Sequence, residues 1–362
     1  MAILYEQIRH AILNDIRSGK LAPGDPVPSE LQLSRQFGVS RITSKKALDT
    51  LRQDGVVVRE RGRGTFVASA PDASARIAAD GVPRRIGFVV PDMSDTFGVH
   101  MLDGIEERVR ALGYQLVLRR THGQVAEEAA AIAEFIASGV SGLIVFPVHG
   151  EFYNAELLKH VLAGFPVVLV DRVLPGIPVP SVCTDNVDAA RALTNVLIEQ
   201  GHRQIAFVSP PSNRTSSIEQ RLQGFRAAMR PYGGGEALTT LECTLPGTSI
   251  RDVAPHDQAR LREFFAAHPG ITGVVACEYT LALLIEMTLE VDGVLDDSRR
   301  IVCFDSVPEP FGRYRFTHIR QEEHRIGTQA VDLLIDVIEQ RATAEPHHVA
   351  VDFTLVDAWT PA

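Results

Sequence analysis

The 362-residue sequence contains only four cysteines, and no two of them form a CxxC pair. Cys183, Cys243, Cys277 and Cys303 are widely spaced, and several of them lie within apolar runs. Zinc sites and redox pairs use closely spaced cysteines. We therefore expect four reduced core residues, with no disulfide framework and no cysteine-bound metal.

Long apolar runs are also missing. No run approaches the roughly 18 residues that a membrane-spanning helix needs, and the N-terminus lacks the charged start and apolar segment of a signal peptide. The sequence therefore predicts a cytoplasmic protein that makes no contact with a membrane.

The motifs of common enzyme classes do not occur. GxSxG, HExxH and a Walker phosphate loop are absent. A Schiff-base enzyme would need a lysine in the body of the protein, and residues 85–362 contain only Lys159, without a supporting motif. His347 and His348 are neighbours in a strand-like segment, so their side chains would point to opposite faces. We expect no catalytic residue, no cofactor and no metal.

Charge is distributed unevenly along the chain. Residues 1–67 contain 11 Lys/Arg and 7 Asp/Glu, a net charge of +4, whereas the whole chain carries −9, which leaves −13 for the remainder. A chain of 362 residues is also longer than a single hydrophobic core usually accommodates, which predicts two or three folding units. A basic head on an acidic body indicates a protein that contacts nucleic acid through its head.

The head shows the pattern of three short helices and a hairpin. A helix is predicted over residues 3–18, a capping box at Ser29–Gln32 begins a second helix that runs to Phe37, and Ser40 caps a third with a buried stripe of Ala47, Leu48 and Leu51. The spacing of the last two is that of a helix-turn-helix. Strands over residues 56–59 and 65–67, joined by a basic turn, predict a wing beside them.

Four motifs carry a family resemblance in this region: YEQI from Tyr5, PGDPVPSE from Pro23, VSRITSKKAL from Val39 and GRGTFV from Gly62. Together they resemble the winged helix-turn-helix of GntR-type transcription regulators, which implies a DNA-binding domain over residues 1–68. The sequence departs from the family at Ser44-Lys45, where valine and arginine are usual, and lysine supplies charge without a bidentate fork.

Such a head would place the first turns of its third helix in the major groove, and its wing near the DNA backbone or minor groove. The predicted DNA contacts are Arg35, Ser40, Arg41, Thr43, Ser44, Lys45, Lys46, Arg61, Gly62, Arg63, Gly64 and Thr65.

Residues 69–84 are rich in Ala, Ser, Pro and Asp and are predicted to be a linker. From Arg85 onward, short Val/Ile/Leu runs alternate with amphipathic stretches, and the same alternation begins again after Asp171. The pattern predicts an α/β body of two doubly wound parallel sheets. We expect lobe 1 over about 85–173 and 322–340, and lobe 2 over about 174–320 and 341–362.

Polar residues follow the predicted strands, where ligands bind in such sheets. Asp, Glu and Arg interleaved with aromatics suit a polyhydroxylated ligand, because charged groups bracket hydroxyls while a ring covers the apolar sugar face.

The motifs PDMSDTFG, GIEERVRALGY, VDRVLPGIPVPSVCTDN, GHRQIAFVS, RLQGFRAAM, FDSVP and IRQ resemble the effector domain of LacI/GalR-type repressors, which is similar to periplasmic sugar-binding proteins. At Glu278-Tyr279 the family usually has Asn-Asp. The resemblance implies effector contacts from Asp95, Phe97, Arg172, Asp185, Arg221, Glu278, Tyr279, Asp305 and Gln321.

The combined expectation is a sugar-responsive transcription repressor that binds a palindromic double-stranded DNA operator as a homodimer. The alternative is the same regulator with a purine, an amino acid or a phosphorylated metabolite as effector. Arg172 and Arg221 favour an anionic effector, and Glu278 opposes one.

Overall fold

The fold is taken from a computed structural model of the whole chain. It describes residues 5, 8–9, 11–12, 15, 20–22, 24–53, 56–60, 63–67, 84–148, 154–211, 215–230, 239–245, 255–296, 298–307, 313–339 and 348–358. The chain divides into two compact units, with the boundary between Arg84 and Arg85. Each unit, called the head and the body below, is considered by itself.

The head contains the predicted helix-turn-helix. Helix α2 covers Glu30–Phe37, and Ser29 caps it through the expected capping box with Gln32. Gly38 ends the helix in the left-handed conformation, and α3 follows at Arg41–Gln53. The Ser40 hydroxyl accepts the Thr43 N–H at 3.2 Å, which is the predicted cap of the third helix.

Two strands form the predicted wing. Strand β1 (Val57–Glu60) pairs antiparallel with β2 (Gly64–Val67). Of the first predicted helix, only some residues are described, and these are helical; among them Ile8 is fully buried with Leu33 and Leu51. Arg61 and Gly62 lie outside the described residues, so their predicted DNA contacts remain predictions.

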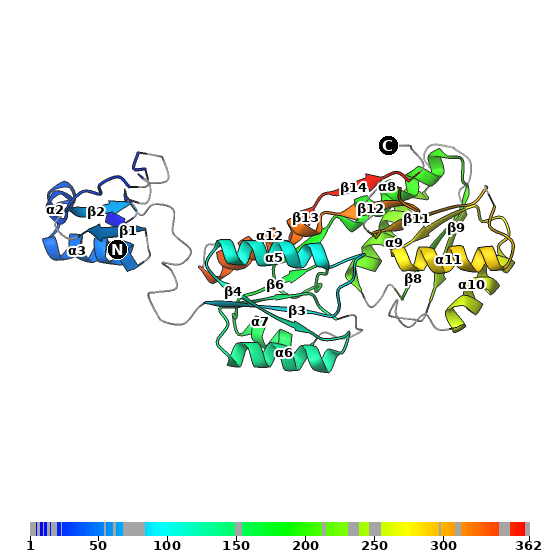
Figure 1. Cartoon of the computed structure of the whole chain (residues 1–362), viewed down its shortest axis with the longest axis horizontal. Coiled ribbons are helices and arrows are strands. Elements are labelled where there is room, and N and C mark those ends of the chain that lie inside the picture. Colours follow the sequence, from blue (N-terminus) through cyan, green and yellow to red (C-terminus); the bar gives the residue numbers. More distant parts are fainter. Residues whose placement is uncertain are drawn as a thin grey trace. The chain divides into compact units, whose positions relative to one another are not determined.

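Lobe 1 of the body is a six-stranded parallel sheet in the order β13-β7-β6-β5-β3-β4, with helices on both faces (Figure 1). Helices α5 and α12 cover one face, and α6 and α7 cover the other. Its elements are β3 (Arg85–Val90), α5 (Val99–Ala111), β4 (Gln115–Arg120), α6 (Val125–Ala137), β5 (Gly142–Val145), α7 (Ala155–Leu162), β6 (Val167–Val170), β7 (Ser181–Thr184), α12 (Glu323–Ile338) and β13 (His348–Val351).

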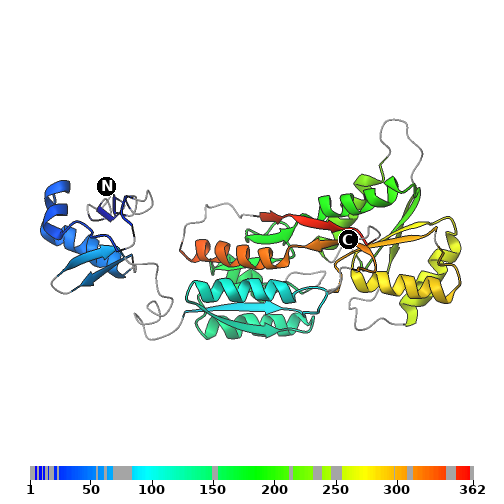
Figure 2. The same cartoon turned by 45° about the horizontal axis from the view of Figure 1, so that its top comes forward.

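Lobe 2 has the same plan, with the order β14-β12-β11-β10-β8-β9; its strands are parallel except for β14 (Figure 2). Helices α8 and α9 pack on one face, and α10 and α11 pack on the other. Its elements are α8 (Asn186–Glu199), β8 (Gln204–Ser209), α9 (Ser216–Ala228), β9 (Thr239–Thr244), α10 (Pro255–Ala267), β10 (Gly273–Ala276), α11 (Tyr279–Val291), β11 (Arg300–Phe304), β12 (Thr317–Gln321) and β14 (Phe353–Val356).

Several inner strands are buried along their whole length, as their continuous apolar runs predicted. Strands β5, β6 and β10 have no exposed residue, because helices cover both faces of each sheet. The four cysteines are buried and unpaired, as expected, and burial raises the pKa of Cys243 to about 11. No helix in the described part of the chain combines the length and apolar character that a bilayer crossing requires.

The predicted lobe boundaries were wrong at two segments. Strand β7, assigned to lobe 2, pairs with β6 in lobe 1, and β13, also assigned to lobe 2, pairs with β7. The chain does not cross after β6; it returns to the same sheet and crosses only after Thr184. Short apolar strands of this kind can extend either sheet, so their sequences did not reveal which sheet they join.

The chain passes between the lobes at three crossover segments, which follow Thr184, Gln321 and Val351. They lie against one another: the Thr184 hydroxyl donates to Gln321 Oε1 at 2.7 Å, and the Asp185 N–H donates to the Val351 carbonyl at 3.1 Å. These crossovers connect the two lobes close to the carboxyl ends of their strands.

Helices α8 and α9 approach each other closely at Gly224. A Cβ atom built there would lie 2.1 Å from the Val187 carbonyl oxygen. We expect Gly224→Ala to lower the free energy of unfolding of the body by about 1–3 kcal/mol, because the two helices would have to separate. Urea denaturation followed by circular dichroism measures this change. The adjacent, exposed Gln223→Ala is the control and should change stability by less than about 0.5 kcal/mol; equal midpoints for both variants would contradict the close approach.

Candidate DNA-binding and effector sites

Asp171 and Arg172 follow β6 at the carboxyl end of the lobe 1 sheet, and both are buried. Arg172 Nε lies 3.4 Å from Asp171 Oδ2, its Nη1 donates to the Pro147 carbonyl, and its guanidinium lies 4.7 Å from the centre of the Phe146 ring. Burial lowers the pKa of Arg172, and the Asp171 carboxylate opposes this effect. The predicted effector residue Arg172 is therefore held rigidly.

A second layer of contacts fixes the loop that carries Phe146. Glu128, on α6, accepts the Val148 N–H at 2.6 Å and the Asn154 amide at 2.9 Å. Burial raises the pKa of Glu128. On the other side of the loop, the predicted effector residue Phe97 packs edge-to-face on Phe146, with ring centres 6.0 Å apart. Phe97, Phe146 and Arg172 thus form a continuous wall.

Arg221, on helix α9, is a buried arginine of lobe 2. Its Nε donates to Asn186 Oδ1 at 2.8 Å, and its Nη1 donates to the Cys277 carbonyl at 2.6 Å. Its guanidinium lies 3.9 Å from the centre of the Phe304 ring. The side chain is buried, so its orientation is set by the first residue of α8, the residue that follows β10 and the last residue of β11.

Two predicted acids, Glu278 and Asp305, share this environment and remain partly accessible to solvent. Desolvation raises the pKa of Glu278, and Arg221 and Arg172 partly oppose this. Desolvation also raises the pKa of Asp305 to about 7, and Asp305 Oδ1 accepts the Gln321 amide at 2.9 Å. Because Arg172 belongs to lobe 1 and Glu278 to lobe 2, these charges act on each other across the lobes.

Asp171 and Asp305 are both in the left-handed backbone region, each with φ of 64°. Non-glycine residues in this region are uncommon, and such strain is concentrated at functional sites. Each aspartate directly follows a central strand, one in each lobe. Each lobe therefore has an aspartate with a strained backbone at the carboxyl end of its sheet, and the two positions match.

Three predicted effector residues have other surroundings. Asp95 is exposed. Asp185 caps α8, where its Oδ1 accepts the Asp188 N–H at 3.0 Å. Tyr279 packs on Phe316 in the lobe 2 core, with ring centres 5.9 Å apart. The Tyr279 ring thus packs in the core of lobe 2, and its predicted effector contact remains a prediction.

The predicted effector residues did not include Phe146, Glu323, Asp171 or Asn186, although Asp171 and Asn186 belong to the polar groups that follow predicted strands. Asp171 could have been chosen on that position alone. Asn186 lies next to the predicted effector residue Asp185, so it could have been included in the predicted site together with Arg221. Nothing local marked Glu323, because its burial arises from α5, more than 200 residues earlier in the chain.

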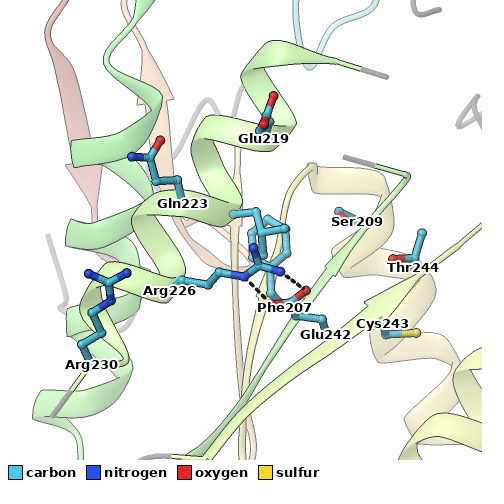
Figure 3. A pocket seen from close by; sticks show the side chains of 10 residues that line it. Phe207, Ser209, Glu219, Gln223, Arg226, Arg230, Glu242, Cys243 and Thr244 are labelled. Carbon is cyan, nitrogen blue, oxygen red and sulfur yellow. Dashed lines mark hydrogen bonds and ion pairs between the residues drawn. The ribbon is translucent and has the colours of Figure 1, made fainter. Parts of the chain in front are cut away.

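A pocket of about 380 Å³ lies elsewhere, on the face of lobe 2 between α9 and strands β8 and β9 (Figure 3). Arg226 spans it and pairs with Glu242 through two contacts of 2.6 and 2.7 Å. None of the nine predicted effector residues lines it. Since this arginine and this carboxylate neutralise each other, we do not assign the effector to this pocket. The described His, Cys, Asp and Glu side chains form no group of three that could hold a metal.

In the head, the first turns of α3 present a set of exposed side chains. Arg41, Lys45 and Lys46 are exposed, and the Lys46 ammonium lies 4.4 Å from the centre of the Tyr5 ring. Thr43 is partly buried, and its hydroxyl lies 2.8 Å from that of Ser40. Of the other predicted DNA contacts, Arg35, Arg63 and Gly64 are exposed, and Thr65 is partly buried.

Two residues of α3 differ from expectation. Ser44 is fully buried in the head, so the predicted DNA contact from its side chain was wrong; it lies on the core side of the helix together with Ala47 and Leu48. Ile42, which was not among the predicted DNA contacts, is 81% exposed. An exposed apolar side chain beside Arg41 is suited to contact with a thymine methyl group.

Two family models match this chain. The model for bacterial regulatory proteins of the gntR family matches residues 4–67, and the model for the periplasmic binding protein domain matches residues 86–342. The chain belongs to the periplasmic binding protein domain family and carries a GntR-type head. Both resemblances seen in the sequence are thereby confirmed.

The chain resembles curated proteins along most of its length. An arabinose metabolism transcriptional repressor from Geobacillus stearothermophilus is 29% identical and covers 93% of this chain and 92% of its own. Another from Halalkalibacterium halodurans is 26% identical and covers 94% and 90%. Both relatives are named as transcriptional repressors, which is the class of protein that the sequence predicted.

The fold of the body is also that of solved regulators. The crystal structure of the Cra transcriptional dual regulator from Pseudomonas putida in complex with fructose 1-phosphate has a TM-score of 0.61 at 23% identity, covering 76% of this chain and 99% of its own. At this level of identity, the similarity establishes the α/β fold of two parallel sheets.

The raised pKa of Asp305 makes the stability of the body depend on pH. Between pH about 4 and about 7 the folded protein retains a proton that the unfolded chain has released, so stability falls as pH rises through this range and levels off above it. Asp305→Asn removes this titration. We expect a shallower decrease of the urea midpoint between pH about 5 and 7 in this variant than in the wild type. Glu323, whose pKa is also about 7, leaves a residual slope; identical slopes for both proteins would contradict the assignment.

Proposed function

We propose that this protein is a transcription repressor of the cytoplasm that binds a palindromic DNA operator as a homodimer and responds to a neutral sugar bound between the lobes of its body. The observation that carries the proposal is the group of charged side chains at the carboxyl ends of both sheets. Arg172 comes from one lobe, Arg221, Glu278 and Asp305 come from the other, and Gln321 lies at the crossover.

The charge of this group favours a neutral effector. Arg172 and Arg221 already interact with carbonyls, aromatic rings and, for Arg172, the Asp171 carboxylate. Asp171, Glu278 and Asp305 add negative charge, which would repel a phosphate. Carboxylates accept hydrogen bonds from sugar hydroxyls, and the Phe97 and Phe146 rings can cover an apolar sugar face. This balance argues against the phosphorylated alternative.

Arabinose is the first sugar to test, because two relatives along the full length are named as repressors of arabinose metabolism. In a thermal-shift experiment, L-arabinose at 100 times its dissociation constant should add about 2.7 kcal/mol to the stability of the body. A sugar phosphate at the same concentration should add much less.

Asp305→Asn supplies the matched variant for this experiment. It should weaken sugar binding about tenfold or more, since the amide loses one acceptor and the negative charge, while operator binding without sugar stays unchanged. Stabilisation of the wild type by phosphates alone would refute the neutral-sugar proposal.

The head would read DNA through the first turns of α3. Arg41 and Lys45 are exposed there, and Ile42 would meet a thymine methyl group beside them. Arg35, Lys46 and the wing residue Arg63 would contact phosphates, which makes affinity fall steeply with salt. Two heads of a dimer would read half-sites about 10 base pairs, or a multiple of that, apart.

Arg41→Ala should weaken operator binding by about 1–3 kcal/mol and relax the sequence preference, because a base contact is lost. Fluorescence anisotropy with operator and scrambled DNA measures both effects. Arg52→Ala is the matched control: Arg52 is exposed on the last turn of the same helix, beside Asp49. Equal losses in the two variants would mean that Arg41 contributes only charge.

Effector binding would change DNA affinity by closing the lobes about the three crossovers. A sugar can shift this equilibrium only to the extent that it binds the closed form more tightly than the open form. Hydrogen bonds that join groups from both lobes supply such a difference, because they are complete only when the lobes are together. The same argument holds whether closure releases the operator or strengthens its binding.

A further inference from the structure

Glu323 joins two segments that lie 225 residues apart in the sequence. It is the first residue of α12, and its side chain is buried. Its Oε2 accepts the Gly98 N–H at 2.6 Å, and the Met101 backbone N–H also hydrogen-bonds to the carboxylate. Since α5 begins at Val99, Glu323 caps that helix from a different helix.

Helices α5 and α12 are in close contact on the same turns. A Cβ atom on Gly327 would lie 2.3 Å from the Met101 carbonyl oxygen, and one on Gly104 would lie 2.2 Å from the His324 carbonyl oxygen. Both distances are shorter than any real Cβ contact, so the helices pack backbone to backbone. The first turns of α5 and α12 must therefore move together.

Helix α12 begins directly after a crossover segment. Gln321 contacts Thr184, at the end of the last strand before the chain leaves lobe 1, and Asp305, in lobe 2. The next residue, Glu322, accepts the hydroxyl of Thr354 in β14 of lobe 2 at 2.8 Å. A change in the angle between the lobes must act on these residues, and hence on the first turn of α12.

The segment capped by Glu323 carries an effector loop. Ser94 and Phe97 bond to each other through their backbones at 2.9 and 3.2 Å, which makes residues 94–97 a tight turn that ends at Gly98. The Phe97 ring packs on Phe146, against which Arg172 also lies. Displacement of Gly98 would therefore move the aromatic wall of the effector site.

We propose that Glu323 is a positioning residue that couples the crossover after Gln321 to the effector loop, so that movement of the lobes sets the place of Phe97. The proposal rests on the proposed function, because it describes how the same effector site is assembled. A buried carboxyl near Asp171 and Asp103 is costly to ionise, and its pKa is raised to about 7. The N–H groups of Gly98 and Met101 offset this cost by donating hydrogen bonds to the carboxylate. The acid at this position therefore holds the start of α5 in place.

Hydrogen exchange of the full-length protein without any ligand tests the capping contact directly. In Glu323→Ala, exchange should be about tenfold faster or more in peptides that cover residues 98–102, because the N–H groups of Gly98 and Met101 lose their acceptor. Glu323→Gln should show a smaller increase, since its amide oxygen can still accept. Asp332→Asn is the control, because it removes one negative charge from a later turn of α12, where Asp332 pairs with Arg108 at the surface, and it should leave these peptides unchanged. Unchanged exchange in Glu323→Ala would overturn the proposal.

The coupling itself is tested by combining substitutions. Gln321→Ala should speed exchange at residues 98–102 when Glu323 is present and should add nothing in the Glu323→Ala background. Additive effects in the double variant would show that the crossover does not act through Glu323, and would overturn the coupling. Neither outcome depends on the identity of the effector.

Calorimetry with L-arabinose connects the coupling to function. Glu323→Ala should raise the dissociation constant about tenfold or more, and Glu323→Gln should restore part of the affinity. Operator affinity without sugar should stay within about twofold of the wild type. Lower stability with unchanged sugar affinity would reduce Glu323 to a structural residue. Failure of the wild type to bind arabinose would count against the proposed sugar, while the exchange results would still decide the role of Glu323.

Discussion

Burial of charge at the carboxyl ends of two parallel sheets is the constraint on which the body of this protein depends. A charged side chain removed from water requires partners, and each of the buried arginines has a carbonyl oxygen and an aromatic ring as partners. The carboxylates receive less compensation, and the pKa values of Glu278, Asp305 and Glu323 are raised as a result. A ligand with hydroxyl groups can donate the hydrogen bonds that these carboxylates do not receive from the protein.

This constraint explains the supporting contacts around the site. Glu128 and Asn154 hold the loop that contains Pro147, and this loop in turn holds Arg172. Asn186 and the Cys277 carbonyl hold Arg221. Gln321 links Asp305 to Thr184 across the crossover. A hydrogen-bonded network of this kind holds its members in place, so the proposed closure is described as a movement of one lobe against the other.

The head differs from the body, because the proposed contact with DNA requires charged side chains that are exposed to water. Its core is small and apolar, and the exposed side of α3 carries arginine and lysine without buried partners of opposite sign. The proposed base contacts depend on the direction in which each side chain points from a short helix. Ser44 and Ile42, two residues apart, exchange the roles that their chemical types suggest: the serine is buried and the isoleucine is exposed.

Much of the architecture was determined by the sequence. The capping box at Ser29, the cap at Ser40 and the alternation of buried strands with amphipathic helices depend on neighbours within a few residues, and the structure contains each of them. Residues that directly follow strands, such as Arg172 and Asp305, could be chosen for the same reason, since the carboxyl ends of parallel strands share one edge. Arg221 was found through the family resemblance.

Only the tertiary structure decided the remainder. The sheet that β7 and β13 join depends on which edge is open, and a short apolar strand carries no mark of that choice. Tyr279 and Ser44 turn towards a core because of how their helices are set against it. Glu323 becomes a buried cap only because Gly104 and Gly327 let two distant helices touch. The sequence by itself determined the local conformations and the kinds of side chain at the strand ends, and long-range packing determined which of those side chains meet, because burial and proximity are properties of the folded chain as a whole.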